Sequence, residues 1–326
     1  MVALAGCTSP STPASSGTGA SSGTGGTAYT FGVIGDVPYD KEAAKKLPSW
    51  VDAINEQRPR FVVHVGDTKE GGDNCSREHD ASIREQFDRF AGALVFTPGD
   101  NDWADCHSKA AGAHDPLERL DDLRAAFYPE PGRTLGRTPL AVTSYAGDGF
   151  PENVTFAQGG VRFAVVHLVG SSDGLEPWTG LGKDEPTKRQ IAAEKARVEN
   201  AVAVLGDAFA AAEASGDRAV VVLTQADLFR DEAPPEALRP VVEALVAGDA
   251  GFGGQVLVIS GDSHEFVTGD HPLAVGSPWL PYYGVDGSSD LTRVVVPGDQ
   301  YASEGWVRFA VASAGATPIS WELLDY

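Results

Sequence analysis

The sequence predicts an α/β protein, a single-domain αββα sandwich in which two mixed β-sheets are flanked by helices. Short apolar runs alternate with segments of helical periodicity through residues 29–100, the pattern of parallel strands joined by helical crossovers. Later runs alternate apolar and polar residues, which indicates antiparallel strands. No linker or internal repeat interrupts residues 29–326, so we expect one domain after a separate N-terminal segment, 1–28.

Apolar periodicity defines the expected elements of the first half. Residues 40–56 carry apolar positions at helical spacing, and residues 77–91 also favour a helix. Three short apolar runs separate and flank these helices, and we expect them to be buried parallel strands: 31–34, 61–65 and 93–97.

The second half mixes antiparallel and parallel character. A hairpin is expected around Gly159-Gly160, between strands at 153–158 and 161–167. Two helices and two buried strands follow, and the last three strands are expected to be antiparallel and to complete a second sheet. The ranges are 184–213 and 235–247 for the helices, 219–224 and 255–260 for the buried strands, and 291–296, 306–312 and 318–324 for the last strands.

The charge balance excludes some classes of partner. The 326 residues include 25 Lys plus Arg against 46 Asp plus Glu, a formal net charge of −21. Such a surface repels a nucleic-acid backbone and offers no basic patch for docking on anionic lipid. No apolar run reaches the ~18–20 residues needed to span a bilayer. We therefore expect a soluble body that does not bind nucleic acid and whose acidity suits the capture of divalent cations.

The first residues resemble a lipid-attachment signal of exported bacterial proteins. Leu4-Ala5-Gly6-Cys7 matches a lipobox, and residues 8–27 are mostly Ser, Thr, Gly, Ala and Pro, the composition of a flexible tether. The basic and apolar regions that precede a lipobox are missing, so we expect the true start upstream. The prediction is an exported protein held on the outer face of the cell membrane only through lipid on Cys7. The alternative is a disordered N-terminus with a chance cysteine.

The two remaining cysteines, Cys75 and Cys106, are candidates for a disulfide. An exported protein meets an oxidising environment, in which such a bridge persists. The alternative is a pair of free thiols in a reducing compartment.

Carboxylates follow the expected strands at the points where the strands end. Gly35-Asp36, Gly66-Asp67 and Gly99-Asp100 end the first three strands, and Gly261-Asp262-Ser263-His264 ends a late one. Ligands of open α/β sheets bind at the carboxyl ends of the strands, and converging carboxylates repel one another unless a cation lies among them. One Gly-Asp is ordinarily a turn. Four at strand ends, the last followed by His264, indicate a metal site.

The same motifs resemble those of the calcineurin-like metallophosphoesterases, which are related to purple acid phosphatases. The resemblance covers nearly all of residues 29–270 and implies that family's fold and two metal ions. Carried over residue by residue, it implies that Asp36 ligates the first metal and that Asp67 bridges both. Asp100 takes the position of the family's Asn ligand, and His264 is the last His ligand.

Four positions depart from the family's pattern. The family's first His falls on Pro38, and its catalytic His, which protonates the leaving group, falls on Asn101. Two further His ligands fall on Gln225 and Asp262. Oxygen donors therefore largely replace nitrogen donors, which favours Mn²⁺, Mg²⁺, Ca²⁺ or iron over Zn²⁺. Because Pro38 cannot ligate, the number of metal ions is left at one or two.

Two functions are consistent with these residues. The first is a metal-dependent hydrolase of a small phosphomonoester or phosphodiester outside the cytoplasm. The second is a catalytically degenerate relative that binds a cation and a ligand or partner. Because Asn101 carries no dissociable proton, Asp102 and His264 are the candidates to supply one. Lys69 is either a ligand of a phosphate oxygen or a solvated loop lysine.

Two histidines inside or beside strands have different expected roles. His64 lies within an apolar strand, so we expect a hydrogen-bonded core residue. His167 ends a strand and is a further candidate for a replacement ligand lining the crevice.

Overall fold

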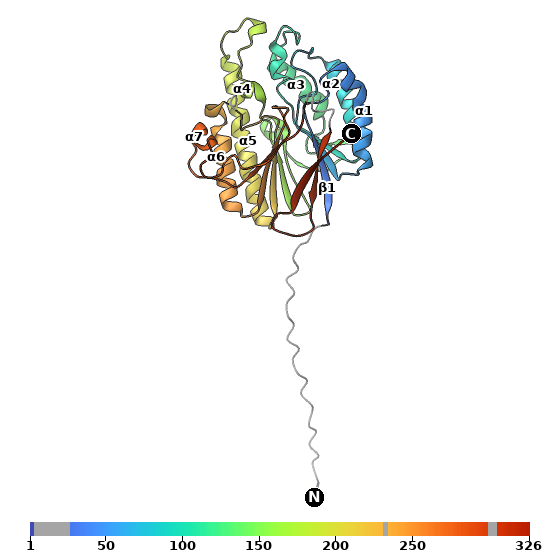
Figure 1. Cartoon of the computed structure of the whole chain (residues 1–326), viewed down its shortest axis with the longest axis vertical. Helices are drawn as coiled ribbons and strands as arrows, with labels where there is room; N and C mark the ends of the chain where they lie inside the picture. The colour runs from blue at the N-terminus through green and yellow to red at the C-terminus, as the bar shows by residue number, and fades with distance from the viewer. Residues whose placement is uncertain (3–26, 231–233, 299–304) are drawn as a thin grey trace.

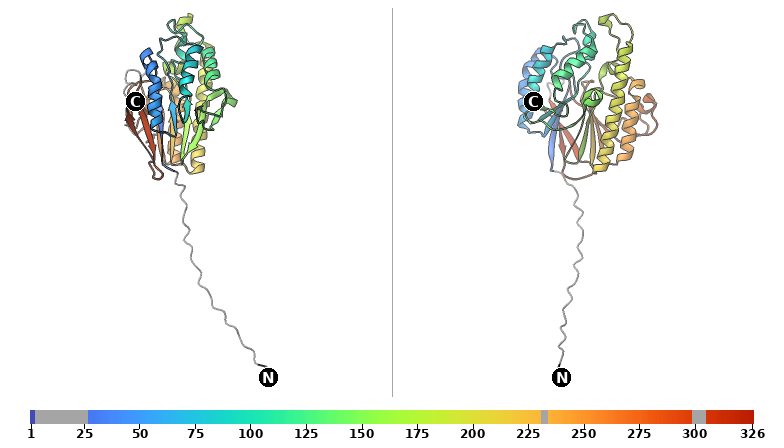
Figure 2. Two further views of the ribbon diagram at one scale, coloured as in Figure 1. Left: turned by 90° about the vertical axis from the view of Figure 1, so that its right-hand side faces the viewer. Right: turned by 180° about the vertical axis from the view of Figure 1, so that it is seen from behind.

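The computed structural model describes residues 1–2, 27–230, 234–298 and 305–326. Two β-sheets pack face to face, and helices cover the outer face of each sheet (Figures 1 and 2). The predicted αββα sandwich is confirmed. Cys7 and most of the 1–28 segment lie outside the described residues, so the predicted division at residue 28 is not tested.

The first sheet has the strand order β13-β12-β1-β2-β3-β4. Its centre is parallel, because β1 pairs with β2 and β2 with β3 in the same direction, while β12, β13 and β4 are antiparallel to their neighbours. The strands span Tyr29–Ile34 (β1), Phe61–His64 (β2), Ala93–Phe96 (β3), Leu135–Gly136 (β4), Trp306–Val311 (β12) and Ile319–Leu324 (β13).

The second sheet has the order β10-β11-β9-β8-β7-β6-β5. Strands β7, β8, β9 and β11 are parallel to one another, and β5, β6 and β10 pair antiparallel with their neighbours. The bounds are Thr143–Tyr145 (β5), Phe150–Gln158 (β6), Val161–Val165 (β7), Ala219–Leu223 (β8), Gln255–Ser260 (β9), Val267–Asp270 (β10) and Thr292–Val295 (β11).

The helices form the outer layers. Helices α1, α2 and α3 pack on the first sheet, and α5, α6 and α7 on the second. Local sequence fixes where two of them begin: Asp40 accepts hydrogen bonds from the first turn of α1, and Thr187 forms a capping box with Gln190 at the start of α5. The bounds are Lys41–Glu56 (α1), Arg77–Phe87 (α2), Pro116–Phe127 (α3), Lys188–Ser215 (α5), Pro235–Phe252 (α6) and Trp279–Tyr283 (α7).

Side chains of each central strand point alternately to the two faces of its sheet. One set packs between the two sheets, and the other packs against the helices. In β1, Phe31 and Val33 face the other sheet, while Ile34 packs among residues of α1. Phe31 meets Phe163 of the second sheet edge-on, with ring centroids 5.2 Å apart. Each such buried aromatic contributes about 1.5–3 kcal/mol to stability. Packing between the sheets therefore fixes the strand ends of the first sheet relative to those of the second.

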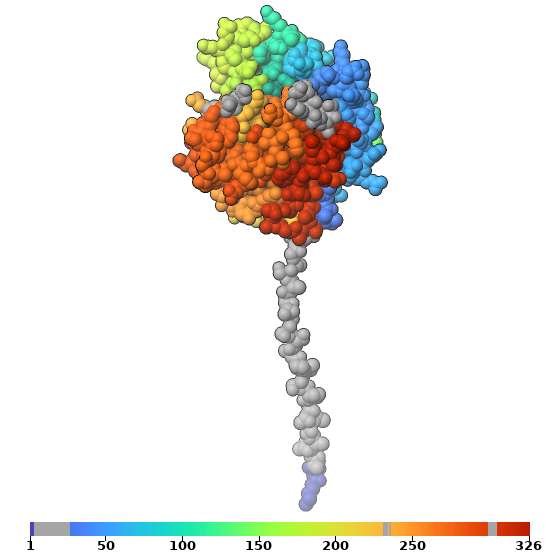
Figure 3. Space-filling model, in the orientation of Figure 1, coloured from blue at the N-terminus to red at the C-terminus, as the bar shows by residue number. Residues whose placement is uncertain are grey.

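The expected tail strands are present, and the strand at 291–296 lies in the second sheet as expected, but the other two belong to the first sheet. Strands β12 and β13 extend the first sheet next to β1, and β11 joins the second sheet parallel to β9. In Figure 3 the end of the chain, red, lies beside segments near its beginning, blue. Apolar alternation shows which side of a strand is buried, but it does not specify the neighbouring strand. Within the described ranges, no helix is long and apolar enough to cross a membrane.

Candidate metal centre

The predicted site residues come from strand ends of both sheets. Asp36, Asp67 and Asp100 follow β1, β2 and β3 in the first sheet. Gln225 follows β8 in the second sheet, and Asp262 and His264 follow β9 there. Asp36 and Asp67 are fully buried (0% and 2% exposed), so the centre lies below the surface.

The backbone at these strand ends is strained. Asp36, Asp67, Asp262 and His264 have φ values of 55°, 60°, 68° and 64°, in the left-handed region that non-glycine residues seldom adopt. Each such residue costs about 1–3 kcal/mol, and such strain gathers at functional sites.

Two of the preceding glycines make room for a neighbouring carboxylate. A Cβ on Gly99 would lie 2.0 Å from Asp67 Oδ1, and one on Gly261 would lie 2.4 Å from Asp36 Oδ2. The Gly-Asp pairs in the sequence therefore reflect close packing of one strand end against the next.

A tyrosine that the sequence motifs did not single out lies at the centre of the site. Tyr39 Oη lies 3.0 Å from Asp67 Oδ2, 3.4 Å from Asp36 Oδ1 and 3.1 Å from His264 Nε2. Asn101 donates a hydrogen bond to the same oxygen through Nδ2, at 3.0 Å. The hydroxyl has one proton, so it can donate to only one of three neighbouring atoms.

Gln225 lies on the other side of Asp67. Its Nε2 donates to Asp67 Oδ2 at 3.1 Å and to Asp100 Oδ1 at 3.0 Å. Its Oε1 accepts from the Gly170 backbone N–H at 2.8 Å, which fixes the orientation of the amide. Two N–H protons thus satisfy two carboxylates, and no ligating atom of Gln225 faces them.

Negative charge dominates the centre. Burial raises the pKa of Asp36 well above its usual range, and repulsion from Asp262 adds to the effect. Burial and the nearby Asp100 likewise raise the pKa of Asp67 strongly, and they raise that of Asp262 to about 7. The Arg230 guanidinium, 3.1 Å from Asp262, offsets part of this charge.

These residues fit one cation better than two. The carboxylate oxygens of Asp36 and Asp67 and the imidazole of His264, gathered around Tyr39, match a hard divalent ion. Around Gln225 and Asp262, by contrast, the amide and Arg230 already supply donors. In the part of the chain that the structure describes, no group of three or more His, Cys, Asp or Glu side chains is arranged to hold a metal ion on its own. A further donor is therefore needed.

Asp102, one of the two candidate proton donors, positions loops instead. Asp102 is buried, and its carboxylate accepts hydrogen bonds from the backbone N–H groups of Asp67, Thr68 and Gly99 and from the Thr68 hydroxyl, at 2.7–2.9 Å. All four are donors, so this carboxylate acts as an acceptor that joins the loops after β2 and β3. Asn101 orients Tyr39.

The loop after β2 also carries Lys69 and Cys75. Lys69 is 3% exposed and donates from Nζ to the Glu70 carbonyl at 3.2 Å, so it is not a solvated loop lysine. Burial lowers its pKa. Cys75 forms a disulfide with Cys106 of the 3₁₀ helix Ala104–His107.

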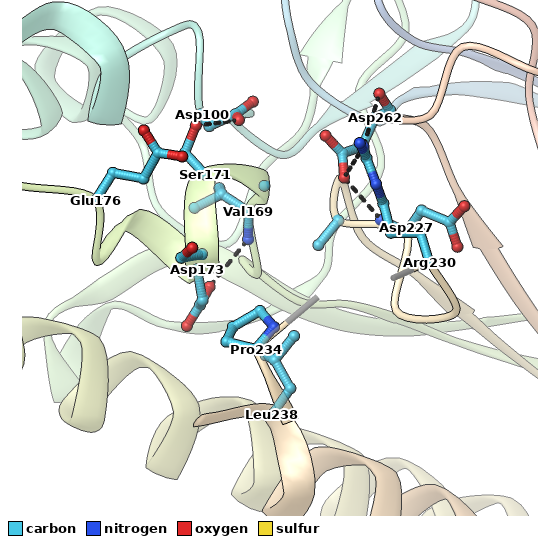
Figure 4. A pocket seen from close by; sticks show the side chains of 13 residues that line it. Asp100, Val169, Ser171, Asp173, Glu176, Asp227, Arg230, Pro234, Leu238 and Asp262 are labelled. Carbon is cyan, nitrogen blue, oxygen red and sulfur yellow. Dashed lines mark hydrogen bonds and ion pairs between the residues drawn. The ribbon is translucent and has the colours of Figure 1, made fainter. Parts of the chain in front are cut away.

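A strained turn and a cavity border the centre on the side of Asp100. In the turn Gly170–Gly174 (α4), Ser171, Ser172 and Asp173 have φ values of 49°, 58° and 53°. Ser171 Oγ lies 2.8 Å from both Asp100 Oδ2 and Asp105 Oδ1, and burial raises the pKa of Asp105 to about 7. Beside this turn lies a cavity of about 220 Å³ (Figure 4).

Figure 4 shows how side chains from both sheets border this cavity. Asp100 and Ser171 lie on one side, and Asp227, Arg230 and Asp262 on the other. The cavity therefore opens directly beside the centre and presents both a guanidinium and carboxylates.

The two strand histidines have structural partners. His64 is fully buried, with Nε2 at 2.9 Å from the Val37 carbonyl, as expected of a core residue. His167 is also fully buried, between Glu152 and the indole N–H of Trp103. Its suggested role as a ligand lining the crevice was wrong, because both ring nitrogens already have partners within the protein.

Comparison with known proteins gives a family and a fold. A model of the calcineurin-like phosphoesterase family matches residues 29–266. The fold is similar to that of a dimetal phosphatase from Danio rerio, at 13% identity and a TM-score of 0.53, with 90% of this chain and 98% of that one covered. No curated protein matches the chain.

Two further solved structures match the chain with lower TM-scores. A purple acid phosphatase from yellow lupin is 11% identical, with a TM-score of 0.44, and covers 93% of this chain and 55% of that one. A phosphatase from Mycoplasma pneumoniae is 12% identical, with a TM-score of 0.42, and covers 92% and 93%.

Proposed function

This chain belongs to the calcineurin-like phosphoesterase family, and we propose on that basis that it is a metal-dependent hydrolase of small phosphomonoesters or phosphodiesters outside the cytoplasm. The observation that carries the proposal is the convergence of Asp36, Asp67 and His264 from three strand ends. An atom of each lies 3.0–3.4 Å from Tyr39 Oη, and His264 Nε2 lies 3.5 Å from Asp36 Oδ1. A bound divalent ion would supply Lewis acidity and offset the charge of a phosphate group.

The surrounding residues define what the protein itself contributes. Asp36, Asp67 and His264 would hold the ion, and Asp102 keeps the loop of Asp67 in place. Arg230, at the edge of the cavity, would bind a phosphate oxygen, and the cavity of about 220 Å³ suits a small leaving group. Because Asn101 cannot give up a proton, we expect aryl esters, whose alcohols leave readily, to react faster than alkyl esters.

Hydrolysis by metal-stripped protein tests the proposal. We expect turnover of nitrophenyl phosphate or bis-nitrophenyl phosphate to return when Mn²⁺, Mg²⁺, Ca²⁺, Fe²⁺ or Zn²⁺ is added singly. Asp67→Asn should lower the restored rate on the order of 100-fold or more. Asp52→Asn is the matched control, since Asp52 is an exposed carboxylate of α1. Equal rates in both variants would remove Asp67 from the centre.

A second candidate function is binding without catalysis. Gln225 donates a hydrogen bond to Asp100, and Arg230 pairs with Asp262. These donors balance carboxylates that a second metal ion would otherwise balance, which favours binding without catalysis. A protein that binds a cation yet hydrolyses neither nitrophenyl ester with any of the five cations would support this candidate over the hydrolase.

The proposed location rests on two features of the chain. Leu4–Cys7 matches a lipobox, and the Cys75–Cys106 disulfide suits an oxidising compartment. We therefore propose that the protein is exported and held at the outer face of the cell membrane through Cys7.

A further inference from the structure

We infer that His79 is a positioning residue of the metal centre, and that it acts on the loop of Asp67 through Thr68 and Asp102. Its ring nitrogen Nε2 lies 3.2 Å from the Thr68 hydroxyl, and Thr68 directly follows Asp67 in the chain. The inference rests on the proposed function only in requiring that a cation binds at this centre. It gives a role to a histidine that comes from helix α2 and not from a strand end.

The hydrogen bonds of Thr68 determine where His79 carries its proton. The Thr68 hydroxyl donates its one proton to Asp102 Oδ1, at 2.7 Å. The hydroxyl can therefore only accept from His79, so the ring nitrogen Nε2 is protonated and donates. Burial lowers the pKa of His79, so the ring is neutral at pH 7 and has a single N–H. The contact with Thr68 thus selects one tautomer of the imidazole.

Thr68 connects His79 to the carboxylate that supports Asp67. Asp102 Oδ1 also accepts from the Thr68 backbone N–H at 2.9 Å, and Asp102 Oδ2 accepts from the Asp67 backbone N–H at 2.9 Å. The φ of Asp67 is 60°, a strained conformation that persists only where the surroundings impose it. By orienting the Thr68 hydroxyl towards Asp102, His79 helps to hold the Asp67 backbone in the conformation that brings its carboxylate to the centre.

Several contacts hold His79 itself in place at the start of α2. Ser76 caps the helix by accepting from the His79 backbone N–H at 3.1 Å, and the preceding residue, Cys75, is fixed by the disulfide. The following residue, Asp80, forms a buried ion pair with Arg119 of α3, at 2.7 Å. The donor to Thr68 is therefore carried by an element that is anchored on both sides, as a positioning role requires.

Calorimetric titration of the metal-stripped full chain with Mn²⁺ tests the inference without relying on catalysis. We expect His79→Ala to weaken Mn²⁺ binding by about 10-fold, and His79→Gln, whose amide N–H replaces the Nε2 donor, to stay within about threefold of wild type. The matched control is His271→Ala, which removes a histidine contact with backbone carbonyls at the end of β10 away from His264 and should leave binding unchanged. Thermal melts check that each variant folds. Wild-type binding by His79→Ala, or a loss in His79→Gln as large as that in His79→Ala, would overturn the inference.

A double-mutant cycle separates action through Thr68 from a general effect on folding. Thr68→Val removes the hydroxyl and keeps the shape of the side chain, and we expect it to weaken Mn²⁺ binding by about 10-fold as well. Because both changes break the same chain of hydrogen bonds, adding His79→Ala to Thr68→Val should weaken binding by no more than about twofold further. Losses that multiply to about 100-fold would overturn the inference. A wild type that binds none of the five cations would reject both this inference and the metal-dependent function, whereas metal binding that is independent of His79 rejects only this inference.

Discussion

His167 shows how neighbouring residues fix the protonation of a single side chain. Its Nε2 accepts a hydrogen bond from Trp103 Nε1 at 3.0 Å, so that nitrogen carries no proton, and Nδ1 lies 2.9 Å from Glu152 Oε1. Glu152 is also paired with Arg124. Burial lowers the pKa of His167 to about 4 from its usual 6.5, because the charged ring would lose hydration, and the Glu152 carboxylate offsets only part of this effect.

The pH dependence of stability should report this histidine. Since its folded pKa is below its unfolded pKa, its contribution is complete above about pH 6.5 and is lost as the pH falls towards 4. We expect wild type to lose about 2 kcal/mol more free energy of unfolding between pH 7.5 and 5 than His167→Gln, which does not titrate. Urea unfolding of both metal-stripped proteins measures the difference. Parallel curves would contradict it.

At the same scale, the sequence predicted some site residues and missed others. Asp36, Asp67 and His264 are predictable because each lies in a Gly-Asp motif or just after one at the end of a strand, and strand ends of parallel sheets converge. Tyr39 and Ser171 come from loops whose side chains return to the centre. The apolar periodicity of the sequence does not predict which loop side chains point towards the centre. The Asp-Xaa-Xaa-Tyr spacing at 36–39 was the only local signal of Tyr39.

Two connections hold the loops after β2 and β3 together at the scale of elements. Asp102 accepts hydrogen bonds from Asp67 and Thr68, and the Cys75–Cys106 disulfide joins the same two loops further out. The bridge closes a loop with a sequence separation of 31 residues. It restricts the unfolded chain, and for loops of this length the gain is about 3 kcal/mol.

Removal of the disulfide should therefore lower stability markedly. We expect the double variant Cys75→Ser, Cys106→Ser to lose about 3 kcal/mol of unfolding free energy in urea. Reductant should destabilise wild type by a similar amount and leave the double variant unchanged, which separates loss of the bridge from any effect of the serines. An oxidised wild type no more stable than the double variant would show that the bridge adds nothing.

Sheet membership was the least predictable property of the elements. Apolar periodicity gave strands at 306–312 and 318–324 but placed them in the wrong sheet. In the structure, β12 pairs with β1, which lies almost three hundred residues earlier in the chain. Such a pairing depends on which sheet edge is free when the core folds. The residue pattern of a single segment does not specify that edge.

At the scale of the whole molecule, the chain enters the fold at the end opposite the centre. Strand β1 begins at Tyr29 and reaches Asp36 after about 20 Å of extended chain. Figure 1 shows β1 beginning at the lower end of the body, whereas α3 and α4 lie at the upper end. If Cys7 carries lipid, the body is attached at the end away from the centre, and the centre is accessible to soluble phosphoesters.

Replacement of the proposed anchor should change location without changing chemistry. In cells expressing the chain from its own gene, we expect wild type in the membrane fraction and Cys7→Ser released in soluble form. The value of kcat/KM on nitrophenyl phosphate should agree within about twofold between the two, because the tether joins the body far from the centre and a soluble substrate does not need the membrane. Cys7→Ser that stays with the membrane would reject the lipid anchor. Released protein with a tenfold lower kcat/KM would instead show that the anchored end influences the centre.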